Sequence, residues 1–555
     1  MLHSEFLLNQ RPDVADAHAA RAWLRELPLT DARAAHHALE ALLNEFDDNT
    51  LGLRKRLDIL ETIRAQRVEI GAQYARRYTG KAVPLAGAER AACAHALSLW
   101  QKLENCYWQC ARAAAAGDGT LRPHLALCLA RAADLACERI KGALRAGQAL
   151  DGTAAAALAQ YAAAAREQGV LDASVPDSLH PKHSVTVASV QQRALLFSLT
   201  GTGGGLLPGR ERECAFELAT MWEGKLAVNW MPSGLTRALT RDDLPPSDEP
   251  ARQRVRILHQ GGQIYFMDVT ALSRSLRKRI HLLGLGKGAG ELKLPASFPA
   301  SGADKLLTRL HGLWCAEDFG RRYPRTAPAS LPAAAPGLAS LTVAPCSAAG
   351  GFEAMVCLID GEPFAANEEA AATSRSRFDE MFVFQGAGHV RRDRQMREAQ
   401  QQFESWRSLD HSAGGGRIGR APGASARCKP GQLLALRSTA RGTDSMAQLA
   451  ELRWCAEQPA GGANVLEAGI ELLAPAPVAV AVRLTGVNAA GAQRWTAAFL
   501  CGGEAEGRML ITPQGWYKPG RTIEILMGNE IQRWLLGPLK RRGTDFEMIE
   551  AARTP

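Results

Sequence analysis

Residues 403–415 read FESWRSLDHSAGG, and this stretch opens the part of the chain in which strand-like segments dominate. We interpret Phe403 to Ser412 as a β-strand that ends in a glycine-rich turn. Asp410 and Ser412 are two residues apart, so both side chains are expected on the same face of that strand. Gly415 follows, and a residue without a side chain leaves room for a ligand beside the backbone.

This strand carries the second of two short motifs, and the first motif lies earlier in the chain. Residues 321–325 read RRYPR, which places Arg321 and Arg325 four residues apart. The arginine guanidinium is planar and always charged, grips phosphate, and matches the O6/N7 edge of guanine. Aspartate accepts hydrogen bonds from the N1 and N2 donors of guanine, and serine donates or accepts. The candidate residues for binding a guanine base and a phosphate are Arg321, Arg322, Arg325, Asp410, Ser412, Gly414 and Gly415.

The two motifs together resemble the PilZ domain, a bacterial receptor for cyclic di-GMP whose pattern is RxxxR followed by DxSxxG or NxSxxG. Arg321 and Arg325 match the first part, and Asp410, Ser412 and Gly415 match the second. The resemblance implies a small β-barrel, with the arginines on a lead-in that closes over the ligand and the other three residues on the barrel face. It implies cyclic di-GMP as the ligand, with neither a cofactor nor a metal.

The spacing of the motifs departs from the PilZ pattern, because Arg325 and Asp410 are separated by far more than a few tens of residues. An insert must therefore loop out and return. Our leading hypothesis is a cytoplasmic cyclic di-GMP receptor that converts nucleotide binding into a change of domain packing and of interaction with an unidentified protein partner. The alternative is a PilZ-like scaffold that binds no nucleotide and serves as a protein-assembly partner. A second basic cluster rivals the arginine motif: Arg391, Arg392, Arg394 and Arg397.

Composition and charge narrow the remaining function classes. With 555 residues, 46% of them hydrophobic, the chain is long enough for several folded domains. Its formal charge of +9 suits an anionic ligand. Few aromatic residues are interleaved with the basic ones, which does not favour nucleic-acid binding. An enzyme is not predicted, because no triad order, metal-ligand spacing or carboxylate pair stands out.

Cysteine usage and apolar runs bear on the compartment. The twelve cysteines include no CxxC pair, which indicates free thiols in a reducing compartment and no zinc site. The first residues lack a secretory signal, and no apolar run approaches the ~20 residues of a membrane span. We therefore expect a cytoplasmic protein without a membrane span.

The pattern along the chain predicts an α+β multidomain architecture. Residues 1–170 read as a helical bundle, and residues 186–318 read as a mixed helical domain with a β-hairpin. Residues 319–485 are expected to form a PilZ-like antiparallel β-barrel with a long insert at about 338–400. Residues 486–555 read as a second small β unit.

Several local expectations accompany this architecture. Thr30-Asp31 is expected to cap a helix, and Val255–Leu258 is expected to pair with Ile264–Met267 in a hairpin. Within the insert, Leu341–Val343 and Phe352–Cys357 read as a strand pair, and residues 361–400 read as polar and irregular.

Three further expectations concern side chains. One helix face is expected to be solvated, and its basic residues are Arg54, Lys55, Arg56, Arg64 and Arg67. Trp406 shares the strand parity of Asp410, so it is either a base-stacking residue or an ordinary aromatic facing the barrel. The run from Gly469 to Leu472 resembles a late PilZ strand.

Overall fold

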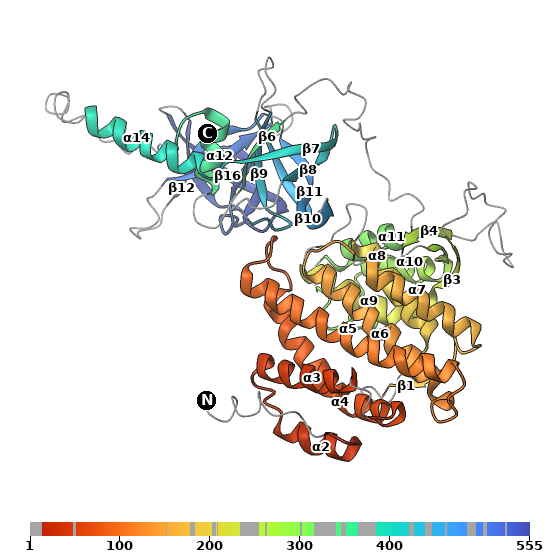
Figure 1. Cartoon of the computed structure of the whole chain (residues 1–555). Helices are drawn as coiled ribbons and strands as arrows, with labels where there is room; N and C mark the ends of the chain where they lie inside the picture. The colour runs from red at the N-terminus through yellow and green to blue at the C-terminus, as the bar shows by residue number, and fades with distance from the viewer. Residues whose placement is uncertain are drawn as a thin grey trace, which may run out of the picture. The chain divides into compact units, whose positions relative to one another are not determined.

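The structure is a computed structural model, and its described residues form two compact units (Figure 1). Unit 1 comprises residues 1–81 and 85–320, and unit 2 comprises residues 82–84 and 321–555. The residues that the structure describes are 14–47, 51–150, 152–177, 184–201, 207, 209–232, 255–260, 263–299, 302–315, 340–345, 351–364, 385–420, 427–438, 447–460, 463–474, 476–485, 495–502, 508–527 and 530–554.

Unit 1 begins with a bundle of helices. Among the described residues its first α-helices are α2 (Ala17–Glu26), α3 (Ala32–Asp47), α4 (Leu53–Tyr78), α5 (Gly87–Ala115), α6 (Leu125–Arg145) and α7 (Gly152–Glu167). The predicted cap is confirmed, because the Asp31 carboxylate accepts a hydrogen bond of 2.9 Å from the Arg33 backbone N–H. Small residues permit close helix packing: a Cβ atom on Gly142 of α6 would lie 2.6 Å from the Trp100 ring of α5.

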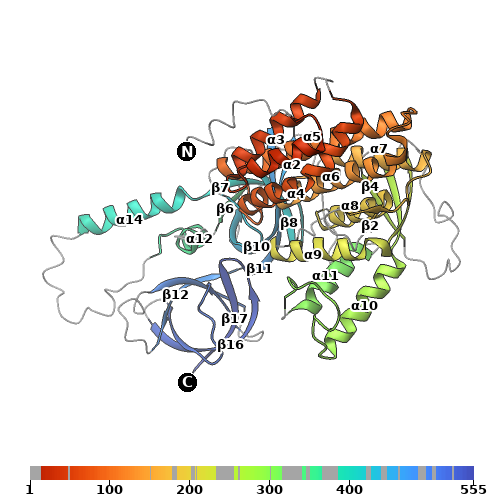
Figure 2. The same ribbon diagram turned by 90° about the horizontal axis from the view of Figure 1, so that it is seen from below.

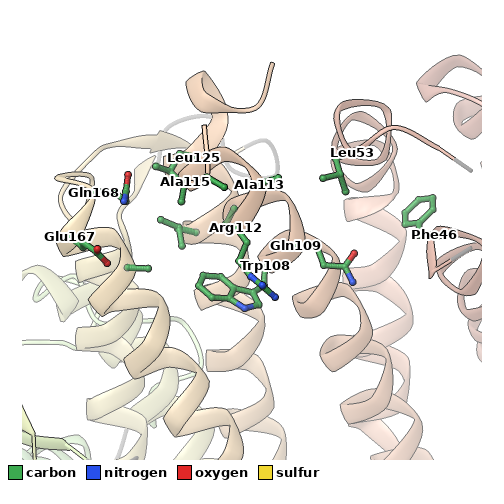
Figure 3. Close-up of a pocket in the computed structure, with 14 residues that line it drawn as sticks. Phe46, Leu53, Trp108, Gln109, Arg112, Ala113, Ala115, Leu125, Glu167 and Gln168 are labelled. Atoms are coloured by element: carbon green, nitrogen blue, oxygen red, sulfur yellow. The ribbon is translucent and has the colours of Figure 1, made fainter. Parts of the chain in front are cut away.

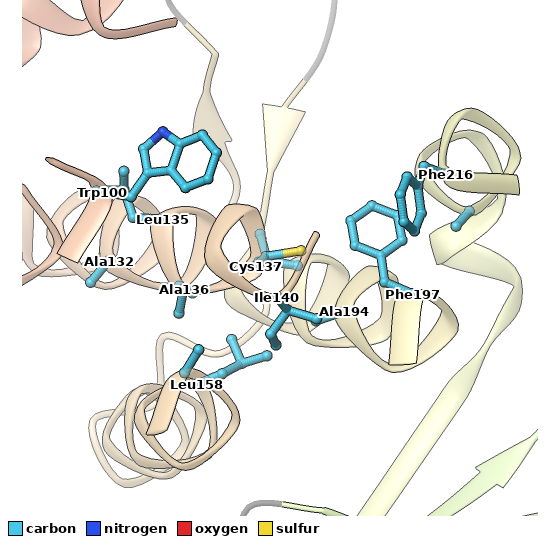
Figure 4. Close-up of a cluster of buried hydrophobic side chains, with 14 of the residues drawn as sticks. Trp100, Ala132, Leu135, Ala136, Cys137, Ile140, Leu158, Ala194, Phe197 and Phe216 are labelled. Carbon is cyan, nitrogen blue, oxygen red and sulfur yellow. The ribbon is translucent and has the colours of Figure 1, made fainter. Parts of the chain in front are cut away.

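The rest of unit 1 adds further helices and a small sheet. They are η1 (Arg122–His124), α8 (Val187–Gly201), α9 (Gly209–Trp222), η2 (Glu223–Lys225), α10 (Thr270–Gly284), α11 (Ala303–Cys315), the pair β1 (Val175–Pro176) and β2 (Ser184–Val185), and the strands β3 (Ala227–Pro232), β4 (Val255–Gln260) and β5 (Gln263–Asp268). The last three form an antiparallel sheet in the order β3-β5-β4, which confirms the predicted hairpin. Side chains from α6, α7, α8 and α9 share one hydrophobic core, in which the rings of Phe197 and Phe216 lie 4.7 Å apart (Figure 4).

The expectation of a solvated basic face on α4 is wrong for three of its five residues, whereas the Arg54 side chain is 41% exposed and Lys55 is exposed. Arg56, Arg64 and Arg67 are buried, with exposed fractions of 3%, 5% and 6%. Arg64 pairs with Asp177, and the Arg67 guanidinium lies 3.8 Å from Asp134, whereas Arg56 donates a hydrogen bond of 2.8 Å to the Leu51 carbonyl. A buried charge is tolerated when it is paired in this way.

Unit 2 contains two closed six-stranded antiparallel barrels (Figure 2). The first barrel has the order β10-β11-β8-β7-β6-β9 and the second has the order β12-β13-β14-β17-β16-β15. The first is built from β6 (Ser340–Pro345), β7 (Glu404–Ser412), β8 (Gly415–Arg420), β9 (Leu433–Ser438), β10 (Gln448–Ala460) and β11 (Ala463–Ala474). The second is built from β12 (Val478–Leu484), β13 (Thr496–Cys501), β14 (Arg508–Pro513), β15 (Thr522–Met527), β16 (Glu530–Arg542) and β17 (Phe546–Arg553).

Two local expectations for the insert are wrong where helices are found, at α12 (Gly351–Asp360) and over residues 385–400 in α14 (Gln385–Gln400), while residues 365–384 lie outside the described part of the chain. The strand expected at Leu341–Val343 is confirmed as β6, although its partners are β7 and β9. The apolar run around Phe352 is ambiguous in the sequence, because a short run of this kind looks the same in a strand and in a buried helix. The Phe352 ring stacks on Phe499 at 5.6 Å, and α12 shares a hydrophobic core with strands of both barrels. The helix therefore packs where the two barrels meet.

The observed architecture is α+β, as the pattern predicted. In the described part of the chain, no helix combines the length and the apolar character needed to cross a membrane. The cysteines of these residues are all buried, and no cluster of three or more metal-ligating side chains occurs among these residues.

Candidate ligand-binding site

The second sequence motif lies on one hairpin of the first barrel. Asp410 and Ser412 belong to β7, Gly414 lies in the turn, and Gly415 begins β8. The antiparallel register pairs Ser412 with Gly415 and Asp410 with Arg417. The first motif, Arg321, Arg322 and Arg325, lies outside the described residues. The structure thus places the acidic and polar half of the predicted site on one β-hairpin.

Asp410 is held in place by a residue that sequence reasoning missed. The aspartate is 8% exposed, and its Oδ2 atom lies 3.1 Å from Nε of Arg417, whose side chain is 41% exposed. Another nitrogen of the same guanidinium, Nη1, lies 3.6 Å from Oε2 of Glu467 in β11. The carboxylate orientation is therefore set by a cation directly across the hairpin. Pairing the two strands about the glycine-rich turn would have revealed this partner.

The turn itself is tied to strand β11. The Leu472 N–H donates a hydrogen bond of 3.0 Å to the Gly414 carbonyl, and the Ser412 hydroxyl donates one of 3.0 Å to the Gly415 carbonyl. Gly415 has φ +151°, and a Cβ atom there would lie 2.1 Å from the carbonyl oxygen of Ile470. The close approach of β11 therefore requires glycine at this position, independently of any ligand.

Trp406 is an interior residue of the first barrel and is not placed to stack on a base. Its side chain is buried in a hydrophobic cluster with Ile418 and Leu452, and the Arg420 guanidinium lies 5.0 Å from its ring centroid. Trp406 and Asp410 do not share a strand face, because the β7–β8 register shifts between Ser408 and Asp410. Such a bulge interrupts the alternation of side chains along a strand.

The rival basic cluster lies on α14, where two of its side chains pair with neighbouring glutamates. Arg392 lies 2.6 Å from Glu362, and Arg394 lies 2.9 Å from Glu398 on the same helix. Both arginines are largely exposed, which is typical of a solvated polar helix surface. This arrangement accounts for the two charges without a ligand.

Unit 1 contains a separate cavity of about 700 Å³ (Figure 3). It opens where the ends of α5 and α7 meet, and Trp108 and Arg112 of α5 and Glu167 of α7 line it. The indole of Trp108 packs 4.9 Å from the ring of Tyr161. A volume of this size is within the range of small-molecule sites. This cavity is the second candidate site, and the sequence carried no motif for it.

One comparison with known proteins relates unit 1 to a family. Residues 18–232 match the family model of the N-terminal domain of the cyclic-di-GMP receptor FimW. No curated protein and no solved structure matches the chain. The FimW match ends before β6, the first strand of the first barrel, so it bears on the helical part and does not test the PilZ resemblance of the barrel.

Proposed function

We propose that this protein is a cytoplasmic receptor for cyclic di-GMP, and that the first barrel and the segment with Arg321 and Arg325 bind the nucleotide. The observation that supports the proposal most is the placement of Asp410 and Ser412 on one hairpin of a closed barrel. The similarity of residues 18–232 to a domain of a cyclic-di-GMP receptor supports the same ligand independently. The Arg–Asp–Ser chemistry of the motifs favours a guanine nucleotide over other anions.

Each group has a defined task in this proposal. The Asp410 carboxylate, held by Arg417 at 3.1 Å, accepts hydrogen bonds from N1 and N2 of one guanine. Ser412 contacts a neighbouring polar group of the ligand. Arg321 and Arg325 contact the phosphates and a guanine face, and Arg322 assists them.

The proposed output is a change of interactions and not a chemical reaction. Nucleotide binding changes how the parts of the chain pack and how a protein partner is bound. Such a switch requires that cyclic di-GMP binds one of two states more tightly than the other.

Calorimetric titration with cyclic di-GMP tests the site. We expect the unmodified protein to bind with a dissociation constant of about 1 µM or lower, near −8 kcal/mol. Arg325→Ala and Asp410→Asn should each weaken binding by about tenfold or more, since a lost charged hydrogen bond amounts to roughly 1.5–3 kcal/mol. Arg533→Ala removes a 73% exposed arginine of the second barrel and serves as the control with unchanged affinity. Full affinity in both site variants would contradict this location.

The scaffold alternative remains, because Asp410 and Gly415 also have structural roles in the barrel. Arg417 binds the carboxylate, and the Ile470 carbonyl occupies the space beside the glycine. If the unmodified, folded protein binds no cyclic di-GMP, Asp410 and Gly415 have only their structural roles in the hairpin. The barrel would then act in protein assembly.

A further inference from the structure

Two glutamates of the first barrel face each other across neighbouring strands. Glu451 of β10 and Glu471 of β11 are direct register partners, and Glu451 is buried. Like charges directly opposite each other destabilise a sheet, more so where water is excluded. The β10–β11 ladder also shifts register between Leu452 and Trp454, beside this pair. This part of the ladder therefore needs cations that hold the two carboxylates together.

One of those cations comes from the second barrel. Arg541 of β16 places Nη1 2.9 Å from Oε2 of Glu451 and Nη2 2.9 Å from Oε1 of Glu471, so one guanidinium bridges both carboxylates. Arg453 of the first barrel adds contacts of 3.1 Å to Glu451 and 3.4 Å to Glu471. Planar two-pronged binding of this kind is specific to arginine.

The bridged strand is the one that holds the motif hairpin. Glu471 pairs in register with Gly415, and the next residue, Leu472, donates its N–H to the Gly414 carbonyl. The preceding carbonyl, that of Ile470, packs against Gly415. A continuous set of contacts thus runs from Arg541 through Glu471 to the turn that carries the candidate ligand residues.

We propose that Arg541 is a positioning residue for the nucleotide site, through which the second barrel holds the β7–β8 hairpin in its binding geometry. This inference rests on the proposed function. Loss of the Arg541 guanidinium removes one of the two arginines that bind Glu451 and Glu471 and leaves Arg453 in contact with both. The repulsion between the two carboxylates then increases, and β11 moves to separate them. The β7–β8 hairpin is then no longer held in position by β11, and the affinity for the nucleotide falls. Because coupling is reciprocal, nucleotide binding in turn stabilises β16.

The test compares Arg541→Gln with a matched charge loss on the same strand. Lys540→Gln removes a cation whose ion pair, 2.7 Å to Glu550, lies within the second barrel. We expect calorimetry with cyclic di-GMP to show about tenfold weaker binding for Arg541→Gln and unchanged binding for Lys540→Gln. Hydrogen exchange should show nucleotide-dependent protection of the β16 amides in the unmodified protein and in Lys540→Gln, but not in Arg541→Gln.

A second variant separates positioning from a general loss of stability. Arg541→Gln combined with Glu471→Gln removes the opposed charge as well, so most of the affinity should return. A purely structural contact would instead give a double variant that binds as poorly as the single one or worse. Wild-type affinity together with wild-type protection of β16 in Arg541→Gln would overturn the inference.

Failure of the proposed function is distinguishable from failure of this inference. If the unmodified protein binds no cyclic di-GMP, the proposed function is wrong, and the contact path is then tested without ligand. Amides of residues 410–417 should exchange faster in Arg541→Gln than in Lys540→Gln. Equal exchange rates in the two variants would overturn the path itself.

Discussion

His36 is a fully buried histidine in the helical unit, and its surroundings make protonation unfavourable. Its ring packs edge-on against Tyr74 of α4 and His95 of α5, and Glu40, one turn later on α3, lies 3.6 Å away. Burial lowers the pKa of His36 to about 4, although the charge of Glu40 acts in the opposite direction. Lys102 and His37 also lie close enough to disfavour a positive charge on the ring.

This burial predicts that unit 1 loses stability in mild acid. Between pH 6.5 and about 4 the unfolded chain binds a proton at His36 that the folded chain does not bind, so stability falls as pH falls. A shift of this size corresponds to about 3 kcal/mol at the acid end. Urea unfolding at several pH values measures the loss. His36→Gln should flatten the dependence and His37→Gln, on the exposed side of the helix, should keep it. An unchanged slope in His36→Gln would contradict the prediction.

At the scale of elements, the contact between α5 and α6 depends on one glycine. A Cβ atom at Gly142 would lie 2.6 Å from the indole of Trp100, which is 4% exposed and also lies close to Gly71 of α4.

We therefore expect Gly142→Ala to destabilise unit 1 by roughly 1–3 kcal/mol, the usual range for overpacking. Gly152→Ala, at the first position of α7, is the matched control, because a Cβ atom added there would meet no heavy atom within 4 Å. Chemical unfolding followed by circular dichroism compares the two. Equal stability in both variants would show that the α5–α6 contact adapts to the added methyl group.

At the scale of the whole molecule, the described residues divide between separate hydrophobic cores. One large core lies in unit 1, and three smaller ones lie in unit 2, one inside each barrel and one where the barrels and α12 meet. Each unit therefore has the means to unfold as its own cooperative body.

Differential scanning calorimetry should accordingly resolve two transitions. Gly142→Ala should lower the midpoint temperature of only one transition, and this identifies that transition as the unfolding of unit 1. Cyclic di-GMP at a hundred times its dissociation constant should stabilise the transition of unit 2 by about 2.7 kcal/mol, because the proposed site lies in the first barrel. If the nucleotide raised the midpoint temperature of unit 1 alone, the binding site would instead lie in unit 1, where the cavity beside Trp108 is the candidate.

Local patterns in the sequence determined much of this protein. The cap at Asp31, the hairpin of Val255–Leu258 and the placement of Asp410 and Ser412 on one strand all depend on residues close together in the chain. Backbone geometry and side-chain periodicity act over such short distances, so these features were predictable without a structure.

Tertiary structure decided what depends on distant partners. The burial of Arg64 required Asp177, the helical state of α12 required two barrels to pack against, and the bridge made by Arg541 required the second barrel to meet the first. In the candidate site, Glu467 of β11, which lies 3.6 Å from Arg417, is likewise brought there by the tertiary pairing of β11 with β8. Burial and ion pairing are set by which segments meet in space, and no local pattern specifies that meeting.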